Sequence, residues 1–417
     1  VINNKNEALK SRYSIGYKIG VGSIENQYYK RFSIKKPAAY AEFSLGGNIT
    51  GGQSGNSILG GKQLGSNDIL SLINDAKKDN TCEGFIIRVG RLGSSLSAVS
   101  VIQEIRNELV KAKKNGKKIF VYIESSASLL EYYVASIADM IFMPEMGAVG
   151  QIGIQYEITK AGQLLKNFGL KQVTISSGKY KASSDIFSDE VTAAEIVMME
   201  KIIDQLFSQV IQEIEESRNL DHEVIEYMSD GRIVSATEAL ELGLVDDLIY
   251  WPDVKNRIKK YIKGVKVKKN ELNTIPLSAF RPFQKGSLLN LFNQIAIIEI
   301  DGAITQGKSG TGFLFGGRSS GVETLEEMIE KVTLNPKIKG VIIRVNSPGG
   351  SILAADRVFK AIEKLKKTKL VYASMGNLAA SGGYYVSLNS NKIYANPSSL
   401  TGSVGVISSR LTYEELS

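Results

Sequence analysis

The sequence predicts an α/β protein made of two tandem copies of one domain, each with a mostly parallel sheet covered by helices. Two observations carry this prediction. Short apolar segments rich in β-branched residues alternate with segments of helical period, an alternation typical of parallel sheets. In addition, four blocks of sequence recur in the same order along the 417 residues, which indicates a duplicated domain.

The repeated blocks lie at nearly one offset. Residues 84–89 (GFIIRV) return as 340–345 (GVIIRV), and the other pairs are 48–55 with 303–310, 131–134 with 383–386, and 150–154 with 402–406. We therefore expect an N-terminal segment at 1–37, a first repeat at 38–250, a basic linker at 251–292 and a second repeat at 293–417. The second repeat ends before the counterpart of residues 166–250, so we expect about 80–90 residues of it to be missing from this chain.

The elements of the second repeat follow from periodicity. We expect a strand at 295–300, a helix at 324–332, a strand at 340–345, a helix at 353–366 and a strand at 369–373. The helix at 353–366 places Val358, Ile362 and Leu365 on one face and basic residues on the other. Such a helix is expected to cover one face of the sheet.

Composition excludes several classes of protein. Hydrophobic residues make up 43% of the chain, and no run reaches the ~18 apolar residues that span a bilayer. The single cysteine, Cys82, excludes an internal disulfide and a cysteine-rich zinc site. The single histidine, His222, lies in an acidic helix start and is expected on the surface, and mechanisms that need two histidines are excluded.

The net charge of +8 is concentrated in one segment. From Val254 to Asn270 the chain has eight lysines or arginines and no acid. We expect a solvated linker or helix face there, with contact to an anionic membrane surface as the alternative. No nucleic-acid recognition motif accompanies the charge, so no nucleic-acid partner is expected.

Two glycine-containing motifs in the second repeat suit acyl-transfer chemistry. Residues 346–351 (NSPGGS) follow a strand and precede a helix, so they form either a tight turn or a turn whose glycines let backbone amides bind an oxyanion. Residues 379–385 (AASGGYY) place Ser381 at a helix start, as an exposed nucleophile with the Gly382 amide beside it or as an N-cap. The first repeat has Leu129 opposite Ser381, and a specialised function can be lost from one repeat more readily than a structural cap.

A nucleophilic serine needs a base. Lysine can serve where burial lowers its pKa. The segment 177–183 (SGKYKAS) offers Lys179 and Lys181, which share one face of an extended chain. Spacing alone does not choose between them.

Together these motifs resemble signal peptide peptidases of the protease IV type (SppA). The matching segments are 346–351, 380–385 and 401–405 (TGSVG) in the second repeat, and 178–181 (GKYK), 231–236 (GRIVSA) and 243–246 (GLVD) in the first. The resemblance covers both repeats. It implies a serine endopeptidase with a Ser/Lys dyad, on a fold like ClpP and crotonase, that degrades released signal peptides and other apolar extended peptides.

The resemblance also implies roles for particular residues. Ser381 matches the nucleophile, Lys181 matches the base with Lys179 as the fallback, and Gly350 and Gly382 match the oxyanion donors. No metal or other cofactor is needed. The family further implies a membrane-attached homotetramer that faces the extracytoplasmic side, and no membrane anchor lies within this chain.

Three other interpretations fit parts of the sequence. Residues 302–309 (GAITQGKS) match the P-loop pattern, but a loop-like sequence follows where a P-loop must open a helix. A crotonase-like acyl-CoA enzyme would use paired amides but leaves Ser381 and Lys181 without a purpose. The third alternative is an inactive assembly protein of the same fold.

Overall fold

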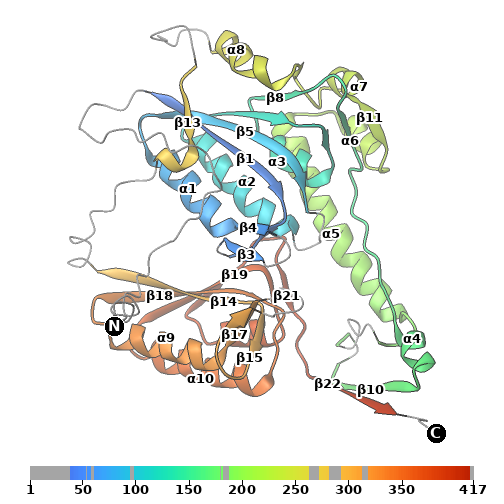
Figure 1. Cartoon of the computed structure of the whole chain (residues 1–417), viewed down its shortest axis with the longest axis vertical. Coiled ribbons are helices and arrows are strands. Elements are labelled where there is room, and N and C mark those ends of the chain that lie inside the picture. The colour runs from blue at the N-terminus through green and yellow to red at the C-terminus, as the bar shows by residue number, and fades with distance from the viewer. Residues whose placement is uncertain are drawn as a thin grey trace, which may run out of the picture. The chain divides into compact units, whose positions relative to one another are not determined.

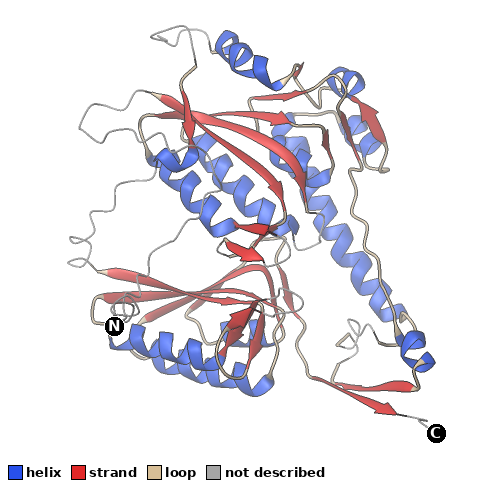
Figure 2. Ribbon diagram, viewed as in Figure 1, coloured by secondary structure: helices blue, strands red, loops and turns tan. Residues whose placement is uncertain are grey.

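The structure, a computed structural model, describes residues 38–413 except 53, 58–60, 94–97, 179, 182–186, 263–271, 281–292 and 312–317. In this part of the chain both repeats belong to one compact unit, and each forms a layered α/β domain (Figure 1, Figure 2). The predicted tandem α/β architecture with parallel sheets is therefore confirmed.

The first repeat is built on a six-stranded parallel sheet in the order β12-β8-β6-β5-β1-β13. Its strands are β1 (Ala39–Gly47), β5 (Cys82–Leu92), β6 (Lys118–Ile123), β8 (Met140–Met143), β12 (Asp247–Leu248) and β13 (Thr274–Pro276). The helices of this half are α1 (Ser66–Lys78), α2 (Ala98–Lys114), α3 (Leu129–Ala135), α4 (Gly162–Asn167), α5 (Ala193–Arg218), α6 (His222–Met228), α7 (Ala236–Glu241), α8 (Trp251–Tyr261) and the 3₁₀ turn η1 (Leu277–Phe280).

Side-chain alternation along β5 gives this sheet two buried faces. Phe85 and Ile87 enter the main core cluster, to which α1, α2 and α3 contribute. Ile86 points the other way and packs in a smaller cluster with Val254 and Ile258 of α8. A strand buried on both faces is apolar at successive positions, which is why this run is prominent in the sequence.

The second repeat has a four-stranded parallel sheet in the order β14-β18-β19-β20, with β21 paired to the end of β19. Its strands are β14 (Gln294–Asp301), β18 (Ile338–Ser347), β19 (Leu370–Ala380), β20 (Lys392–Tyr394) and β21 (Leu400–Gly402). Its helices are α9 (Val322–Leu334), α10 (Ile352–Lys366) and α11 (Gly382–Ser387). The five elements expected from periodicity all appear here and are confirmed.

Small sheets beside the main ones repeat the duplication. In the first repeat β2 (Ile49–Thr50) and β3 (Gly55–Ser57) flank β4 (Gly61–Gly65), and in the second β15 (Ala303–Thr305) and β16 (Gly310–Thr311) flank β17 (Arg318–Gly321). Each trio has one parallel and one antiparallel pairing. A third small sheet joins β7 (Ser126–Ala127), β9 (Ala148–Gly150) and β11 (Ile233–Ser235).

Two distant strands form an antiparallel ribbon. β10 (Leu170–Ser176) follows α4 in the first repeat, and β22 (Ile407–Tyr413) follows β21 in the second. All seven residues of β10 pair with β22, from Leu170 with Tyr413 to Ser176 with Ile407. This ribbon brings the two repeats together at the site described below (Figure 1).

The expected linker is folded where it is described. α8 buries Val254 and Ile258, while Lys255 forms an ion pair with Glu42 at 2.8 Å. β13 adds a parallel edge strand next to β1. The rest of the expected linker, 263–271 and 281–292, and the expected N-terminal segment 1–37 lie outside the described residues. Among the helices that are described, none combines the length and apolarity needed to cross a membrane.

Candidate active site

Ser381 occupies a strained turn between a strand and a helix. β19 ends at Ala380 and α11 begins at Gly382, and Ser381 between them has φ 52° and ψ −118°. For a residue other than glycine, such a backbone conformation costs about 1–3 kcal/mol. Ser381 is the N-cap residue of α11 by position, but its side chain makes no capping hydrogen bond to the helix.

The Pro-Gly-Gly turn packs directly against this serine. Gly349 has φ 96°, and a Cβ there would lie 2.6 Å from the amide nitrogen of Gly382 and 2.8 Å from the Cβ of Ser381. Gly350 has φ 152°, and a Cβ there would lie 2.2 Å from the carbonyl oxygen of Ile304. Both positions therefore require glycine. Because these residues have no side chain, the backbone of the turn can lie against the backbone of the nucleophile candidate.

The two predicted oxyanion donors lie close together. A Cβ on Gly382 would lie 3.5 Å from the amide nitrogen of Gly350. The groups flanking Gly350 are engaged, since Ile304 donates to the Gly349 carbonyl at 2.8 Å and accepts from the Ser351 amide at 2.9 Å. The Gly382 amide lies in the first turn of α11 and has no acceptor within the helix. Two amides in this arrangement suit a shared oxyanion.

The Pro-Gly-Gly turn is held from below by Ser347. This side chain is buried at the end of β18, donates to the Gly302 carbonyl at 2.6 Å and accepts from the Gly349 amide at 3.1 Å. Ser351 caps α10 by accepting from the Ala354 amide at 3.3 Å. The turn is thus fixed at both of its ends.

The β10–β22 ribbon brings Lys181 to the same region. Lys181 lies five residues after the end of β10, and its Nζ donates to the carbonyl of Ser403 at 2.7 Å and to the Ser403 hydroxyl at 3.1 Å. Ser403 directly follows Gly402, whose carbonyl accepts from the Ser381 amide at 2.9 Å. The serine and lysine candidates, from different repeats, are therefore hydrogen-bonded to two adjacent residues: Gly402, the last residue of β21, and Ser403, which follows it.

The surroundings of Lys181 favour its neutral form. Burial lowers the pKa of this lysine below its ordinary value. The missing side chain of Gly405 leaves space for the Lys181 side chain, because a Cβ there would lie 3.5 Å from Cγ and Cδ of Lys181 and 2.5 Å from the Ser177 carbonyl oxygen. The segment before Lys181 is also hydrogen-bonded to the segment after Ser403, from the Ser177 amide to the Val406 carbonyl at 2.9 Å.

The other basic candidates stand differently. Lys179 lies outside the described residues. His222 is 78% exposed beside Glu215, as expected for a surface residue. Lys308 lies in the P-loop-like segment, which continues into β16 and not into a helix.

The first repeat keeps the scaffold of the site but fills it differently. Leu129 stands at the position of Ser381 and is buried. Glu131, opposite Gly383, is 2% exposed, and its carboxylate accepts from the amide of Leu92 at 2.5 Å and from the amide of Ser128 at 3.0 Å. This capping box satisfies the amides between strand and helix in the first repeat, where the second repeat has glycines and no such carboxylate.

Comparison with known proteins identifies the family of this chain. The sequence profile of peptidase family S49 matches residues 111–266 and 363–417, about half of the chain. The chain belongs to this family. It is 31% identical over 318 residues to the chloroplastic serine protease SPPA of Arabidopsis thaliana, covering 76% of this chain and 46% of that protein. It is 26% identical over 365 residues to protease 4 of Haemophilus influenzae, covering 85% of this chain and 58% of that protein.

The chain thus spans about half the length of the curated S49 relatives that it matches. Among solved structures, the 1510-N membrane-bound stomatin-specific protease aligns with 54% of this chain and 86% of its own, at 14% identity and a TM-score of 0.32.

Two residues of this S49 site were not found by sequence reasoning. Ser403 lies in the repeated block at 402–406, but the sequence does not predict a role for it. Its contact with Lys181 joins residues 222 positions apart. Ser347 was also missed, since a serine before Pro-Gly-Gly gives no sign that its hydroxyl holds the turn. The contact of Ser403 with Lys181 and that of Ser347 with the Gly302 carbonyl both join residues far apart in the sequence.

Proposed function

We propose that this chain is a serine endopeptidase in which Ser381 is the nucleophile and Lys181 is the general base. The observation that carries the proposal is the joint attachment of both residues to the Gly402–Ser403 segment. Family membership supports a peptidase, and the strained, uncapped Ser381 supports an exposed nucleophile.

The mechanism follows from these positions. Neutral Lys181 takes the proton from the Ser381 hydroxyl as the serine oxygen attacks the peptide carbonyl. The amides of Gly350 and Gly382 donate to the oxyanion of the tetrahedral intermediate. Lys181 then gives its proton to the leaving amine, which breaks the C–N bond and leaves an acyl-serine. Water, deprotonated by Lys181, attacks that ester. The bond between the acyl carbon and the Ser381 oxygen breaks, Lys181 returns the proton to that oxygen, and the acid product leaves.

Ser403 supports the base role in this mechanism. Its carbonyl and hydroxyl both accept from Lys181 Nζ, so neutral groups among the described residues hold the amine in place. A carboxylate would stabilise the ammonium form and raise the pKa, whereas burial lowers the pKa. The amine is therefore suited to accept a proton at a lower pH than an ordinary lysine.

The substrates are proposed to be apolar extended peptides, including released signal peptides. Large apolar side chains are exposed in the segments that flank the site, namely Ile352 and Leu353 after Gly350, and Val404 and Val406 after Ser403. Exposed apolar groups around polar chemistry are typical of a binding site for apolar ligands. The relatives named above, serine protease SPPA and protease 4, support proteolysis.

We further propose that the chain assembles head to tail with further copies, as a homotetramer, at the extracytoplasmic face of a membrane. The internal repeat supports the assembly. Ser398 of the second repeat is 2% exposed because it contacts α2 of the first, whereas its counterpart Met146 is 89% exposed. The equivalent contact, between Met146 of one copy and α10 of another, is left open within a single chain.

The test is hydrolysis of an unstructured apolar peptide and of a signal peptide by this chain, next to Ser381→Ala and Lys181→Met. We expect both variants to lose at least ~10³-fold in kcat, as expected when a nucleophile or its base is removed. Lys331→Met, at an exposed lysine of α9, serves as the matched control and should retain full activity. A fluorophosphonate probe should label Ser381 in the parent and in the control. Full activity in the Ser381→Ala or Lys181→Met variant would show that the site is wrongly assigned.

A further inference from the structure

A tight turn leads into β21, the strand at whose end both catalytic candidates are hydrogen-bonded. The turn is residues 396–399, and its amide and carbonyl groups are tied to one another: Ser399 donates to the Asn396 carbonyl at 3.0 Å, and Asn396 donates to the Ser399 hydroxyl at 3.1 Å. The Ser399 hydroxyl also donates to the Gly376 carbonyl at 2.6 Å. β21 begins directly after it, so a displacement of the turn displaces β21.

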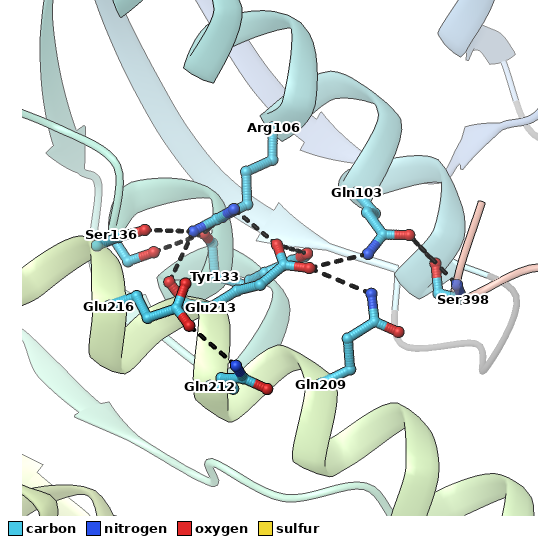
Figure 3. Close-up of polar contacts among 10 residues, drawn as sticks. Gln103, Arg106, Tyr133, Ser136, Gln209, Gln212, Glu213, Glu216 and Ser398 are labelled. Atoms are coloured by element: carbon cyan, nitrogen blue, oxygen red, sulfur yellow. Dashed lines mark hydrogen bonds and ion pairs between the residues drawn. The ribbon is translucent and has the colours of Figure 1, made fainter.

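Gln103 of α2 reaches across from the first repeat and holds this turn. Its side-chain oxygen accepts from the amide of Ser398 at 3.3 Å and from the Ser398 hydroxyl (Figure 3). Its side-chain nitrogen donates to Glu213 of α5 at 3.1 Å. Because Glu213 is itself held by Arg106 and Tyr133, each at 2.7 Å, the Gln103 amide has one orientation in which both of its ends are satisfied.

Glu104, the next residue of α2, holds the other end of the turn. Its carboxylate accepts from Asn396 Nδ2 at 2.9 Å, and both of its oxygens accept from Nη2 of Arg344 of β18 at 2.7 Å. The two charged side chains are 12% and 13% exposed. Arg344 also donates to the Ser374 hydroxyl at 3.0 Å and to the Met375 carbonyl at 3.2 Å, so the pair joins the turn to two strands of the sheet.

This contact exists only at the repeat that carries the nucleophile candidate, within the described residues. In the first repeat the counterpart of Ser398 is Met146, which is 89% exposed, so no helix covers that turn within the described residues. The contact made by the polar pair of α2 is therefore found at the second-repeat turn.

We infer that Gln103 and Glu104 are positioning residues that fix, through Ser398 and Asn396, the strand to which Ser381 and Lys181 are attached. The inference rests on the proposed peptidase function. β21 carries the Gly402 carbonyl that binds the Ser381 amide, and the residue after it, Ser403, binds the Lys181 amine. A helix of the first repeat thus determines the distance between a nucleophile in the second repeat and a base in the first.

The experiment compares Gln103→Leu, Ser398→Ala and the double variant with the parent chain. Gln103→Leu keeps the size of the side chain and removes both hydrogen-bonding ends. We expect kcat for an apolar peptide to fall at least tenfold in each single variant while KM changes less than twofold. The double variant should be no worse than the poorer single one, because both act through one contact. Gln212→Leu, on the exposed side of α5, is the matched control and should equal the parent.

A second measurement does not depend on activity. Hydrogen exchange of the β21 amides, which pair with the end of β19, should be faster in Gln103→Leu and Ser398→Ala than in the parent. Unchanged exchange, or a parental kcat in both single variants, overturns the inference. If the parent chain cleaves no peptide, the proposed function fails, and the exchange rates still decide whether α2 fixes β21. Where Gln103→Leu does not fold, Ser398→Ala alone decides, because it removes only one oxygen.

Discussion

Ser381, the proposed nucleophile, has an unusual backbone conformation for a residue with a side chain. Its φ of 52° and ψ of −118° suit glycine, yet a serine stands there. A strained residue of this kind is retained where the exposed side chain is needed. The glycines around it, Gly349 and Gly382, allow the close backbone approach that keeps the turn sharp.

The backbone strain at Ser381 predicts an effect on stability that is independent of the effect on activity. Ser381→Gly and Ser381→Ala should both be inactive, but Ser381→Gly should be more stable by about 1 kcal/mol, because only glycine relieves the positive φ. Urea unfolding of the two variants measures the difference. Equal stabilities would mean that the turn relaxes in solution and carries no strain.

The second residue-scale prediction concerns pH. Burial lowers the pKa of Lys181, so its neutral form is present at a lower pH than for an ordinary lysine, whose pKa is about 10.4. Hydrolysis, measured as kcat/KM, should therefore rise with increasing pH and level off below that value. Lys181→Arg should show no such rise, since arginine stays protonated over the whole range. A parental profile that is flat from pH 5 to 9 would contradict the base role.

At the scale of elements, the β10–β22 ribbon delivers the lysine. The amide of Ser177 continues the ribbon by one hydrogen bond, to the carbonyl of Val406, just before the chain turns towards Lys181. Ser177→Pro removes that amide and should lower kcat at least tenfold while the cores of both repeats stay folded. Ser177→Ala, which keeps the amide, is the control. Circular dichroism checks the fold of both variants, and an active Ser177→Pro would show that the ribbon does not position the base.

The elements that the sequence predicted differ in kind from those that it did not. β18, α10 and β19 were predicted because each buries an apolar face with a clear period. The ribbon was not, because Val173 and Ile175 of β10 are exposed and its partner lies more than two hundred residues away. α8 was expected as part of a linker, since its basic residues hide the two buried positions, Val254 and Ile258.

The same limit applies to the candidate site. The motifs drew attention to Ser381, Gly350 and Gly382, because small residues between a strand and a helix have a local signature. The position of Lys181 needed the fold, and the roles of Ser347 and Ser403 needed the hydrogen bonds. Sequence alone identifies the chemistry of the turn but not the contacts that join the two repeats.

At the scale of the whole molecule, the two repeats share a fold but differ at the junction between strand and helix where the candidate site lies. In the first repeat the buried Glu131 satisfies the amides of Leu92 and Ser128, so that junction is a stable structural cap. In the second repeat Gly383 stands at the equivalent position, and the amide of Gly382 has no acceptor within its helix. In the proposed mechanism, the first repeat supplies structural support and the second supplies the amides that bind the reacting carbonyl.

The duplication also predicts a surface for assembly. Within the chain, α2 of the first repeat covers the turn at Ser398, and a second copy placed by the same relation would cover Met146 with its α10. Met146→Asp would put a charge in that contact and should weaken association at least tenfold, a loss of about 1.4 kcal/mol. Leu334→Asp, at a side chain of α9 that is 74% exposed and has no equivalent in the internal contact, is the control. Sedimentation of both variants over a range of concentrations measures the effect. If Met146→Asp associates as the parent does, copies of this chain do not meet by repeating the internal contact.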